Sequence, residues 1–133
     1  MTDTQNHFVR FKLPVILWAL FIFGASSIPG AAFPKLLILQ YDKVIHMIFY
    51  GIFGCTVFLA LEPKSIFPRP AWRRYFWTLL IVTLYGASDE FHQSFVPGRT
   101  MDSHDLMADF AGGCVALIFI MMYMRNRRIS GNG

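Results

Sequence analysis

Charged side chains are scarce in this chain of 133 residues, because Asp, Glu, Lys and Arg together make up 15% of it while 55% is hydrophobic. A soluble domain of this size carries a far more polar surface, so we exclude a water-soluble globular protein. Cysteine is scarce too. Cys55 and Cys114 each lie inside an apolar run, where we interpret them as small hydrophobic residues. They predict neither a disulfide framework nor a zinc site, since nothing polar accompanies either one at a suitable spacing.

Several signatures of function are absent as well. The chain has no internal repeat, no low-complexity segment and no H-E-x-x-H zinc motif, and Ser88 and Ser94 lack a defined base partner that would make them nucleophiles. The formal net charge is +4, but the basic residues form no single stripe with interleaved aromatic side chains. We therefore expect no binding to nucleic acid.

What the chain does contain is four long apolar runs. They read LPVILWALFIFGASSI, VIHMIFYGIFGCTVFLAL, YFWTLLIVTLYGAS and LMADFAGGCVALIFIMMYM. Each approaches the roughly 20 residues that cross a bilayer once flanking residues are included. We therefore predict an all-α fold, an integral membrane four-helix transmembrane bundle with short connections. The expected division is an N-terminal tail over residues 1–12, the four-helix transmembrane domain over 13–124 and a basic C-terminal tail over 125–133.

Punctuating residues place the ends of the predicted helices. Pro14 suits a first helical turn and Pro29-Gly30 stops a helix, so the first span is expected over about 14–27. The second is expected from near Asp42 to near Glu62, the third over about 72–95, and the fourth from Ser103, its expected N-cap, to the basic segment MRNRR. The segment AAFPKLLILQ is expected to be an apolar outer loop in the membrane interface or a short helix.

The basic residues divide unevenly between the two sides of the predicted bundle. Nine fall on the side of the termini and three on the other: the nine are Arg10, Lys12, Lys64, Arg69, Arg73, Arg74, Arg125, Arg127 and Arg128, and the three are Lys35, Lys43 and Arg99. By the positive-inside rule, both termini are expected in the cytoplasm. The N-terminal run also resembles a signal peptide, but prolines flank the weak cleavage site at residues 30–32, so we expect it to be retained.

The acidic residues divide the other way. Six of the eight fall at or near the outer ends of the predicted spans: Asp42, Asp89, Glu90, Asp102, Asp105 and Asp109. A carboxylate at bilayer depth costs roughly 2.5–3.5 kcal/mol on insertion scales. Asp89 and Asp109 lie a turn or more inward, so they need a partner, water or neutralisation.

Helical spacing arranges the polar residues in three stripes, one on each of the last three predicted spans. The stripes are Asp42, His46 and Tyr50; Tyr85, Asp89 and His92 or Gln93; and Asp102, Asp105 and Asp109. All three stripes lie at the outer ends of their helices. We therefore expect them to converge on one pocket, which Arg99 enters from the connecting loop.

The stretches YDKVIHMIFYG, DEFHQSFVPGR and DLMADFAGG combine into one pattern. Together they resemble the VanZ-like family of small bacterial membrane proteins, whose pattern is Asp-Lys with His three residues after the Lys, then Asp-Glu-x-x-Gln, Pro-Gly-Arg, and Asp-x-x-x-Asn with a following Gly. The matching positions are Asp42, Lys43, His46, Asp89, Glu90, Gln93, Pro97, Gly98, Arg99, Asp105 and Gly112. Asp109 departs from the pattern, since Asn is frequent there in the family.

The resemblance covers about residues 13–124 and implies a cell-envelope protein. It also implies a link to antibiotic resistance, because the name member of the family is associated with low-level resistance to the glycopeptide teicoplanin. Together with the charge bias, it predicts a multi-pass protein of the bacterial inner (plasma) membrane whose polar cluster faces outside. The resemblance supplies no mechanism.

Two interpretations of the polar residues stay open. His46, Asp89 and Asp105 are candidate ligands for a divalent metal such as Zn²⁺, Mg²⁺ or Mn²⁺. The alternative, which we favour at this point, is a metal-free network in which Lys43 and Arg99 compensate the acids.

For catalysis, we expect His46, oriented by Asp42, to act as a general base with Asp89 or Asp105 as its complement. Lys43 and Arg99 would bind a phosphate, and the remaining substrate-binding candidates are Glu90, Gln93 and Asp109. The predicted function is hydrolysis or transfer of a phosphate ester on an anionic lipid-linked envelope precursor, such as a cell-wall intermediate, with membrane lipids as the other partner. The alternative is a non-catalytic binding or envelope-modifying membrane protein whose polar cluster is a structural ion-pair network.

Overall fold

A computed structural model describes residues 3–32, 35–61 and 72–130 of the chain. These residues form helices joined by turns, with no strand among them, as the apolar runs predict. The elements are α1 (Asp3–His7), the π-helical turn η1 (Phe8–Lys12), α2 (Leu13–Ser26), the 3₁₀ turn η2 (Gly30–Ala32), α3 (Lys35–Ala60), α4 (Trp72–Gln93) and α5 (Ser103–Ser130).

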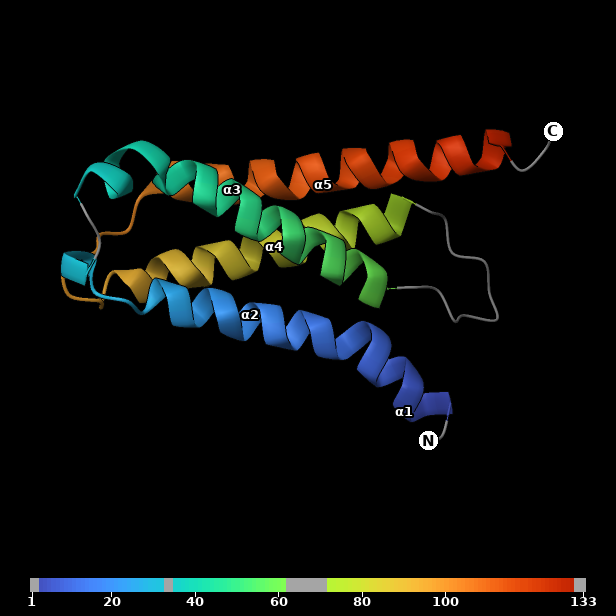
Figure 1. Cartoon of the computed structure of the whole chain (residues 1–133), viewed down its shortest axis with the longest axis horizontal. Helices are drawn as coiled ribbons and strands as arrows, with labels where there is room; N and C mark the ends of the chain where they lie inside the picture. The colour runs from blue at the N-terminus through green and yellow to red at the C-terminus, as the bar shows by residue number, and fades with distance from the viewer. Residues whose placement is uncertain (1–2, 33–34, 62–71, 131–133) are drawn as a thin grey trace.

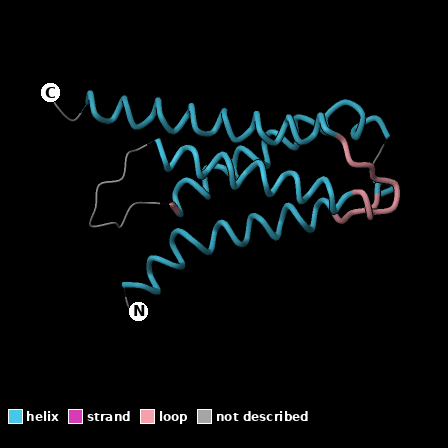
Figure 2. The backbone as a smooth tube through the Cα atoms, turned by 180° about the vertical axis from the view of Figure 1, so that it is seen from behind, coloured by secondary structure: helices cyan, strands magenta, loops and turns pink. Residues whose placement is uncertain are grey.

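The four long helices run alongside one another in a single bundle (Figure 1). Helix α1 and the C-terminal end of α5 lie at one end of it. The turn that follows α2 and the connection from α4 to α5 lie together at the other end, as the tube drawn from behind shows (Figure 2). The predicted all-α four-helix architecture is confirmed.

The helix boundaries differ from the predicted ones mainly on the N-terminal side. Helix α3 begins at Lys35, seven residues before Asp42, so most of the expected outer loop is helical. Its residues KLLILQ are good helix formers and contain neither Gly nor Pro. The first helical stretch likewise begins before Pro14, because α1 and η1 lead directly into α2. The expected end of the second span at Glu62 lies outside the described residues.

The N-cap of α5 is Asp102 and not Ser103, so that prediction was wrong. Asp102 Oδ1 accepts a hydrogen bond of 2.8 Å from the backbone N–H of His104, while Ser103 is already the first helical residue. A carboxylate in this position satisfies one of the free N–H groups of the first turn and suits the helix dipole.

Three helical stretches among the described residues are long and apolar enough to cross a membrane: Gln5–Ser26, Tyr41–Ala60 and Ser103–Arg127. Helix α4 is not one of them, since charged residues lie near both of its ends. Large apolar side chains are exposed around the bundle, including Leu20, Leu84 and Phe119 at 61%, 61% and 71% of their surface. Soluble monomers rarely expose so much apolar surface, so this surface fits a membrane protein.

Close backbone contact between α3 and α5 brings the polar residues of the two helices together. A Cβ atom added to Gly112 would lie 2.2 Å from the backbone oxygen of Met47 and 3.0 Å from the nitrogen of Gly51. Small residues permit such an approach between membrane helices. One turn away, this contact places His46 of α3 next to Asp109 of α5.

The two turns at the site end of the bundle are joined through glycines. The N–H of Gly30 donates a hydrogen bond of 3.0 Å to the carbonyl oxygen of Pro97. A Cβ on Gly30 would lie 2.1 Å from the carbonyl oxygen of Gly98, which itself has a φ of +75°. Only glycine fits without strain at position 30, where a Cβ has no room, and at position 98, where φ is positive. The Pro-Gly-Arg turn is thereby held against the end of α2, with Arg99 beside the bundle interior.

Candidate functional site

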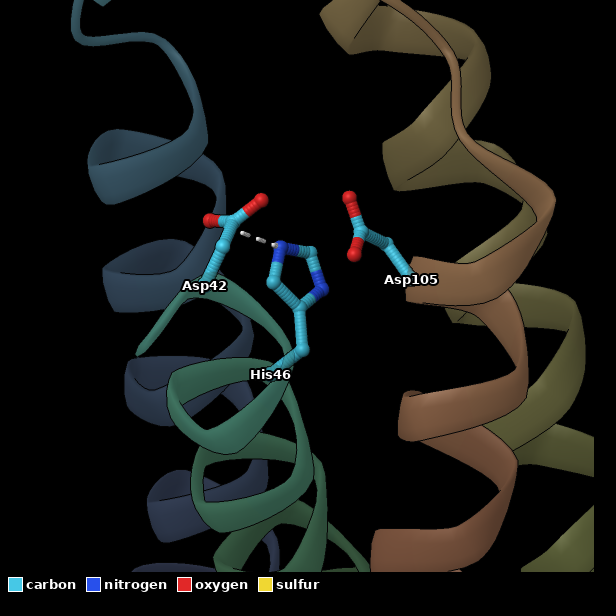
Figure 3. A group of neighbouring side chains, drawn as sticks. All are labelled: Asp42, His46 and Asp105. Carbon is cyan, nitrogen blue, oxygen red and sulfur yellow. Dashed lines mark ion pairs between the residues drawn. The ribbon is translucent and has the colours of Figure 1, made fainter. Parts of the chain in front are cut away.

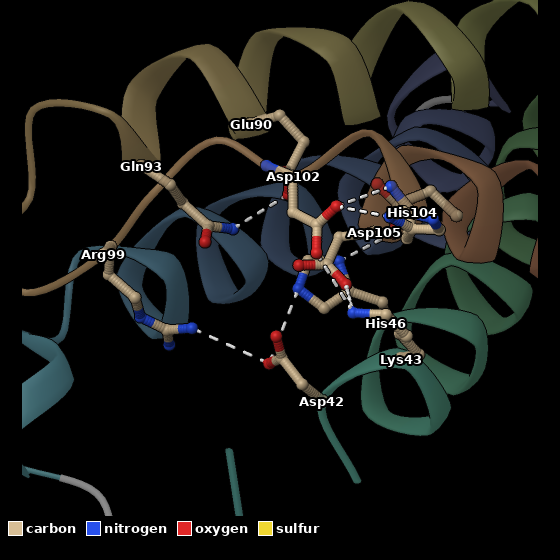
Figure 4. Close-up of polar contacts among 10 residues, drawn as sticks. Asp42, Lys43, His46, Glu90, Gln93, Arg99, Asp102, His104 and Asp105 are labelled. Carbon is tan, nitrogen blue, oxygen red and sulfur yellow. Dashed lines mark hydrogen bonds and ion pairs between the residues drawn. The ribbon is translucent and has the colours of Figure 1, made fainter. Parts of the chain in front are cut away.

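Ten polar residues gather at one end of the bundle, opposite α1 and the C-terminal end of α5. This polar cluster, most of it drawn in Figure 4, consists of Asp42, Lys43, His46, Asp89, Glu90, Gln93, Arg99, Asp102, Asp105 and Asp109. Three helices and one loop contribute to it. All nine predicted catalytic and substrate-binding residues belong to it.

The imidazole of His46 is at the centre of the polar cluster. It is 8% exposed, and its Nδ1 lies 2.9 Å from Oδ1 of Asp109, a residue that is completely buried. Its Nε2 is 4.0 Å from Asp42 Oδ1, which is too long for a hydrogen bond. The orienting partner of His46 is therefore Asp109 from the facing helix, where the i,i+4 spacing had suggested Asp42.

This hydrogen bond decides which nitrogen of His46 is available for chemistry. A carboxylate can only accept, so Nδ1 carries the hydrogen that it donates to Asp109. In the neutral ring, the lone pair is then on Nε2, which points toward Asp42 and Asp105 (Figure 3). Nε2 can accept a proton or bind a metal ion.

Lys43 connects two carboxylates of the segment that begins α5. Its Nζ lies 2.9 Å from Asp105 Oδ1 and 3.2 Å from Asp102 Oδ2. Asp105 is buried, whereas Lys43 and Asp102 are partly exposed. The backbone N–H of His104, then its ring nitrogen, and then Lys43 stabilise the ionised form of Asp102 and lower its pKa to about 2.

Asp42 and Arg99 form a second ion pair at the mouth of the polar cluster. Arg99 Nη1 is 3.7 Å from Asp42 Oδ1. Asp42 comes from α3 and Arg99 from the turn after α4, so the pair links that turn to the helix. Both side chains line the cavity described below.

Asp89 and Glu90 of α4 have separate partners. Ser26 of α2 donates a hydrogen bond of 2.7 Å to Asp89 Oδ2, and Gln93 donates to Asp89 at 3.1 Å and to Glu90 at 3.4 Å. Glu90 also accepts the backbone N–H of Asp102 at 2.9 Å. Glu90 therefore fixes the loop that leads into α5. Sequence reasoning did not single out Ser26, whose only signal was a small polar residue at the end of an apolar run.

Three buried polar atoms in the bundle interior have no hydrogen-bond partner among the described residues. They are Tyr50 Oη, Asp89 Oδ1 and Asp109 Oδ2, one each from α3, α4 and α5. Gly86 leaves room for one of them, because a Cβ there would lie 2.7 Å from Asp109 Oδ2. Buried polar groups are nearly always hydrogen-bonded in native proteins. Tyr50 and Asp89 lie close enough to interact with each other, which leaves Asp109 Oδ2 as the atom still in need of a partner.

A cavity of about 660 Å³ lies between α2 and α3 and reaches the polar cluster. Its outer wall is apolar and includes Leu20, Phe21, Ile45 and Phe49, three of which are substantially exposed on the surface of the bundle. Most of the cavity surface is apolar, and the polar residues that contribute to its lining are Ser26, Asp42, His46, Tyr50, Asp89, Gln93 and Arg99. The cavity thus joins a lipid-like surface to ionisable side chains.

Two sets of three side chains offer oxygen and nitrogen atoms close enough together to hold a metal ion. One is Asp42, His46 and Asp105, and the other is His46, Glu90 and Asp109, with the ligand atoms of each set within 4.8 Å of one another. His46 and Asp105, two of the three predicted metal candidates, occur in the first set. Asp89, the third candidate, occurs in neither set among the described residues.

A serine and a histidine also meet near the polar cluster, but not as a nucleophile and its base. Ser27 Oγ lies 3.0 Å from His92 Nε2, and the same Oγ donates a hydrogen bond of 2.7 Å to the carbonyl oxygen of Phe23. A hydroxyl has one hydrogen to donate. Because it goes to Phe23, His92 is the donor to Ser27 and cannot take its proton.

The sequence model of a family described as VanZ/LLP1 matches residues 6–124 of the chain. No curated protein and no solved structure matches the chain.

Proposed function

The chain belongs to the VanZ/LLP1 family, and from this premise we propose that it is a cell-envelope membrane protein that acts on an anionic lipid-linked envelope precursor. The proposed reaction is hydrolysis or transfer of a phosphate ester. In keeping with the VanZ-like resemblance, the proposal includes a contribution to resistance against glycopeptides such as teicoplanin. It also places the polar cluster at the outer face of the bacterial inner membrane.

The observation that carries this proposal is the two-sided lining of the cavity. Apolar side chains of α2 and α3 form one wall, and Asp42, His46 and Arg99 contribute to the other. Its volume of about 660 Å³ lies within the range of small-molecule sites. A lipid-linked precursor has the same division between an apolar chain and a charged headgroup.

His46 and Arg99 supply the groups that phosphate-ester hydrolysis requires. His46, with Nδ1–H donated to Asp109, presents Nε2 as a base for an attacking water. As the water oxygen bonds to phosphorus, the water proton passes to Nε2. The ester P–O bond breaks, and the alcohol oxygen that leaves takes up a proton from the imidazolium. Arg99, beside the same cavity, is the cation that would bind the phosphate oxygens.

A second candidate function is binding without turnover. It is favoured by the existing ion pairs, since Lys43 already contacts Asp102 and Asp105 and Arg99 lies near Asp42. In that case the polar cluster is a structural lock, and the protein shields or sequesters its ligand.

Purified protein in nanodiscs, incubated with a radiolabelled isoprenoid monophosphate, tests the proposal. We expect release of phosphate, and we expect His46→Ala and Asp105→Asn to lower the rate by about 100-fold or more, the usual range for losing a general base or its support. Ser94→Ala is the matched control, because Ser94 is exposed and its hydroxyl donates a hydrogen bond to the backbone carbonyl of Phe91. Binding of the lipid without any product would favour the second function.

A second experiment uses cells. His46→Ala and Asp105→Asn should both lose teicoplanin tolerance while their levels in the membrane stay unchanged. Wild-type tolerance in both variants would make the polar cluster structural.

A further inference from the structure

We propose that Asp42, His46 and Asp105 form a divalent-cation site at the polar end of the cavity (Figure 3). His46 contributes Nε2, and each aspartate contributes one carboxylate oxygen. The inference goes beyond the proposed function, because an ion can bind here whether or not the protein acts on a lipid.

The spacing of the three ligands fits one ion. Their ligand atoms lie within 4.8 Å of one another. Metal–ligand bonds of about 2.0–2.2 Å allow two ligands of one ion to be at most about 4.4 Å apart. Small side-chain rotations would therefore suffice to close the site, with no movement of the backbone.

The environment of His46 is an independent observation that points to a metal. Its ring is 8% exposed, and its Nδ1 bonds to the completely buried carboxylate of Asp109 at 2.9 Å. Histidines that bind metals usually donate their second ring N–H to such a carboxylate, which fixes the ring and its tautomer. Nε2 has no hydrogen-bond partner in the part of the chain that the structure describes, and Asp42 Oδ1 lies 4.0 Å from it. The lone pair on Nε2 thus faces the two carboxylates.

The local charge favours a cation between Nε2 and these carboxylates. Four carboxylates gather around the one imidazole, those of Asp42, Glu90, Asp105 and Asp109. Lys43, the cation that contacts Asp105, is half exposed and shared with Asp102. A divalent ion between Asp42 and Asp105 would offset the repulsion of these acids at short range.

The other set of three ligands is a poorer site. Both Glu90 oxygens already accept hydrogen bonds, from Gln93 and from the backbone of Asp102. Asp109 Oδ1 is held by His46. By contrast, Asp42 and His46 line the cavity, so an ion bound to them would have coordination positions open to a ligand.

One imidazole nitrogen and two carboxylate oxygens suit Zn²⁺ or Mn²⁺. Open positions on such an ion would accept water or a phosphate oxygen. An ion on Nε2 would occupy the lone pair that otherwise serves as the base. If the proposed function is correct, the ion would therefore take over that role by lowering the pKa of the attacking water, while Arg99 binds the phosphate of the substrate.

Manganese binding to the purified, EDTA-treated full chain tests the site in the absence of any lipid substrate. We expect about one Mn²⁺ per chain by electron paramagnetic resonance, and a nitrogen coupling in the pulsed spectrum that His46→Ala removes and His104→Ala keeps. Asp105→Asn should weaken Mn²⁺ binding at least tenfold. Asp102→Asn is the matched control, because Asp102 also contacts Lys43 but belongs to neither set of ligands; it should change the affinity less than threefold.

Two results would overturn the site: no stoichiometric Mn²⁺ binding, or binding that lacks nitrogen coupling and is equally weakened in both aspartate variants. Asp109→Asn keeps the site testable if His46→Ala fails to fold, since an amide oxygen still accepts from Nδ1. It should retain the nitrogen coupling while the affinity falls by about 10- to 100-fold, the usual cost of changing the partner of a metal-binding histidine. Phosphate release without Mn²⁺ binding would refute the site and keep the proposed function, and Mn²⁺ binding without phosphate release would do the reverse.

Discussion

At the scale of single residues, the chemistry of this protein depends on which partner each polar side chain has. Asp109 holds one side of His46, so that the other side faces Asp42 and Asp105. Asp89 is instead bonded to Ser26 and Gln93. These two acids, both expected inside the bundle and both in need of partners, therefore have different roles: one positions the histidine, and the other ties α2 to α4.

Asp102 carries a residue-scale prediction about pH. Its pKa is lowered from 3.8 to about 2 because its ionised form bonds to the backbone and ring of His104 and to Lys43. A lowered pKa means that the ionised carboxylate stabilises the folded state fully above pH 3.8, and that this stabilisation is lost as the pH falls through about 2.

We therefore expect Asp102→Asn to lower the thermal midpoint of the detergent-solubilised protein by the same amount at pH 7 and at pH 5. The difference from the wild type should shrink below about pH 4, as the wild-type carboxylate begins to take up protons. A difference that grows as the pH falls would contradict the assignment. Asp3, remote from the polar cluster in sequence, provides the control as Asp3→Asn.

At the scale of elements, the contact between α3 and α5 does most to position the polar cluster. Two membrane helices gain little from burying apolar side chains against each other, because lipid is equally apolar, so close packing has to hold them together. Gly51 and Gly112 allow that packing. The pairs His46–Asp109 and Lys43–Asp105 then form between the same two helices.

This contact predicts that Gly112→Ala destabilises the protein. The added Cβ would lie 2.2 Å from the backbone oxygen of Met47, so the helices must separate. We expect the free energy of unfolding to fall by about 1–3 kcal/mol, the usual cost of overpacking, measured by denaturant titration in mixed micelles. The same separation should weaken Mn²⁺ binding, because His46 and Asp105 lie on the two helices that part.

Gly24→Ala is the matched control for that change. A Cβ on Gly24 meets nothing within 4 Å, and alanine has the higher helix propensity. Its stability should equal or exceed that of the wild type. If both alanine variants are equally stable, α3 and α5 are not held together by the glycine contact.

At the scale of the whole molecule, the bundle has two unlike ends. The polar cluster occupies one, and α1 and the C-terminal end of α5 lie at the other (Figure 1). Arg73 and Arg74 belong to the first turn of α4, and Arg125 and Arg127 to the last turns of α5. The excess of basic residues on that second side predicts that it faces the cytoplasm. The polar cluster would then meet ligands that arrive from the outer leaflet.

Cysteine labelling tests this orientation. With Cys55 and Cys114 replaced by alanine, a cysteine at Thr100 should react with a membrane-impermeant maleimide on intact cells. One at Ser130 should react only after the membrane is permeabilised. Both positions are exposed in the structure, so unequal labelling reports the side of the membrane. The reverse pattern would place the polar cluster in the cytoplasm.

The sequence by itself determined the helices and the faces on which their polar residues lie. Four apolar runs near the length of a bilayer crossing predict four helices, and residues three or four apart share a face because helical geometry is local. The stripes of Asp42 and His46 on α3 and of Asp105 and Asp109 on α5 follow from spacing alone. So does the expectation that they lie at one end of the bundle.

Only the tertiary structure decided which atoms meet. His46 bonds to Asp109, which is 63 positions away in the sequence, and not to Asp42 on its own helix. Ser26 and Asp89, which bond to each other, are also 63 positions apart. Spacing along one helix cannot reveal such pairs, because they depend on how far each helix slides and rotates against its neighbour. Here Gly112 against Gly51 and Met47 sets that register. The close contact between the two helix backbones thereby determines that the carboxylate of Asp109 orients His46, and that those of Asp42 and Asp105 face Nε2.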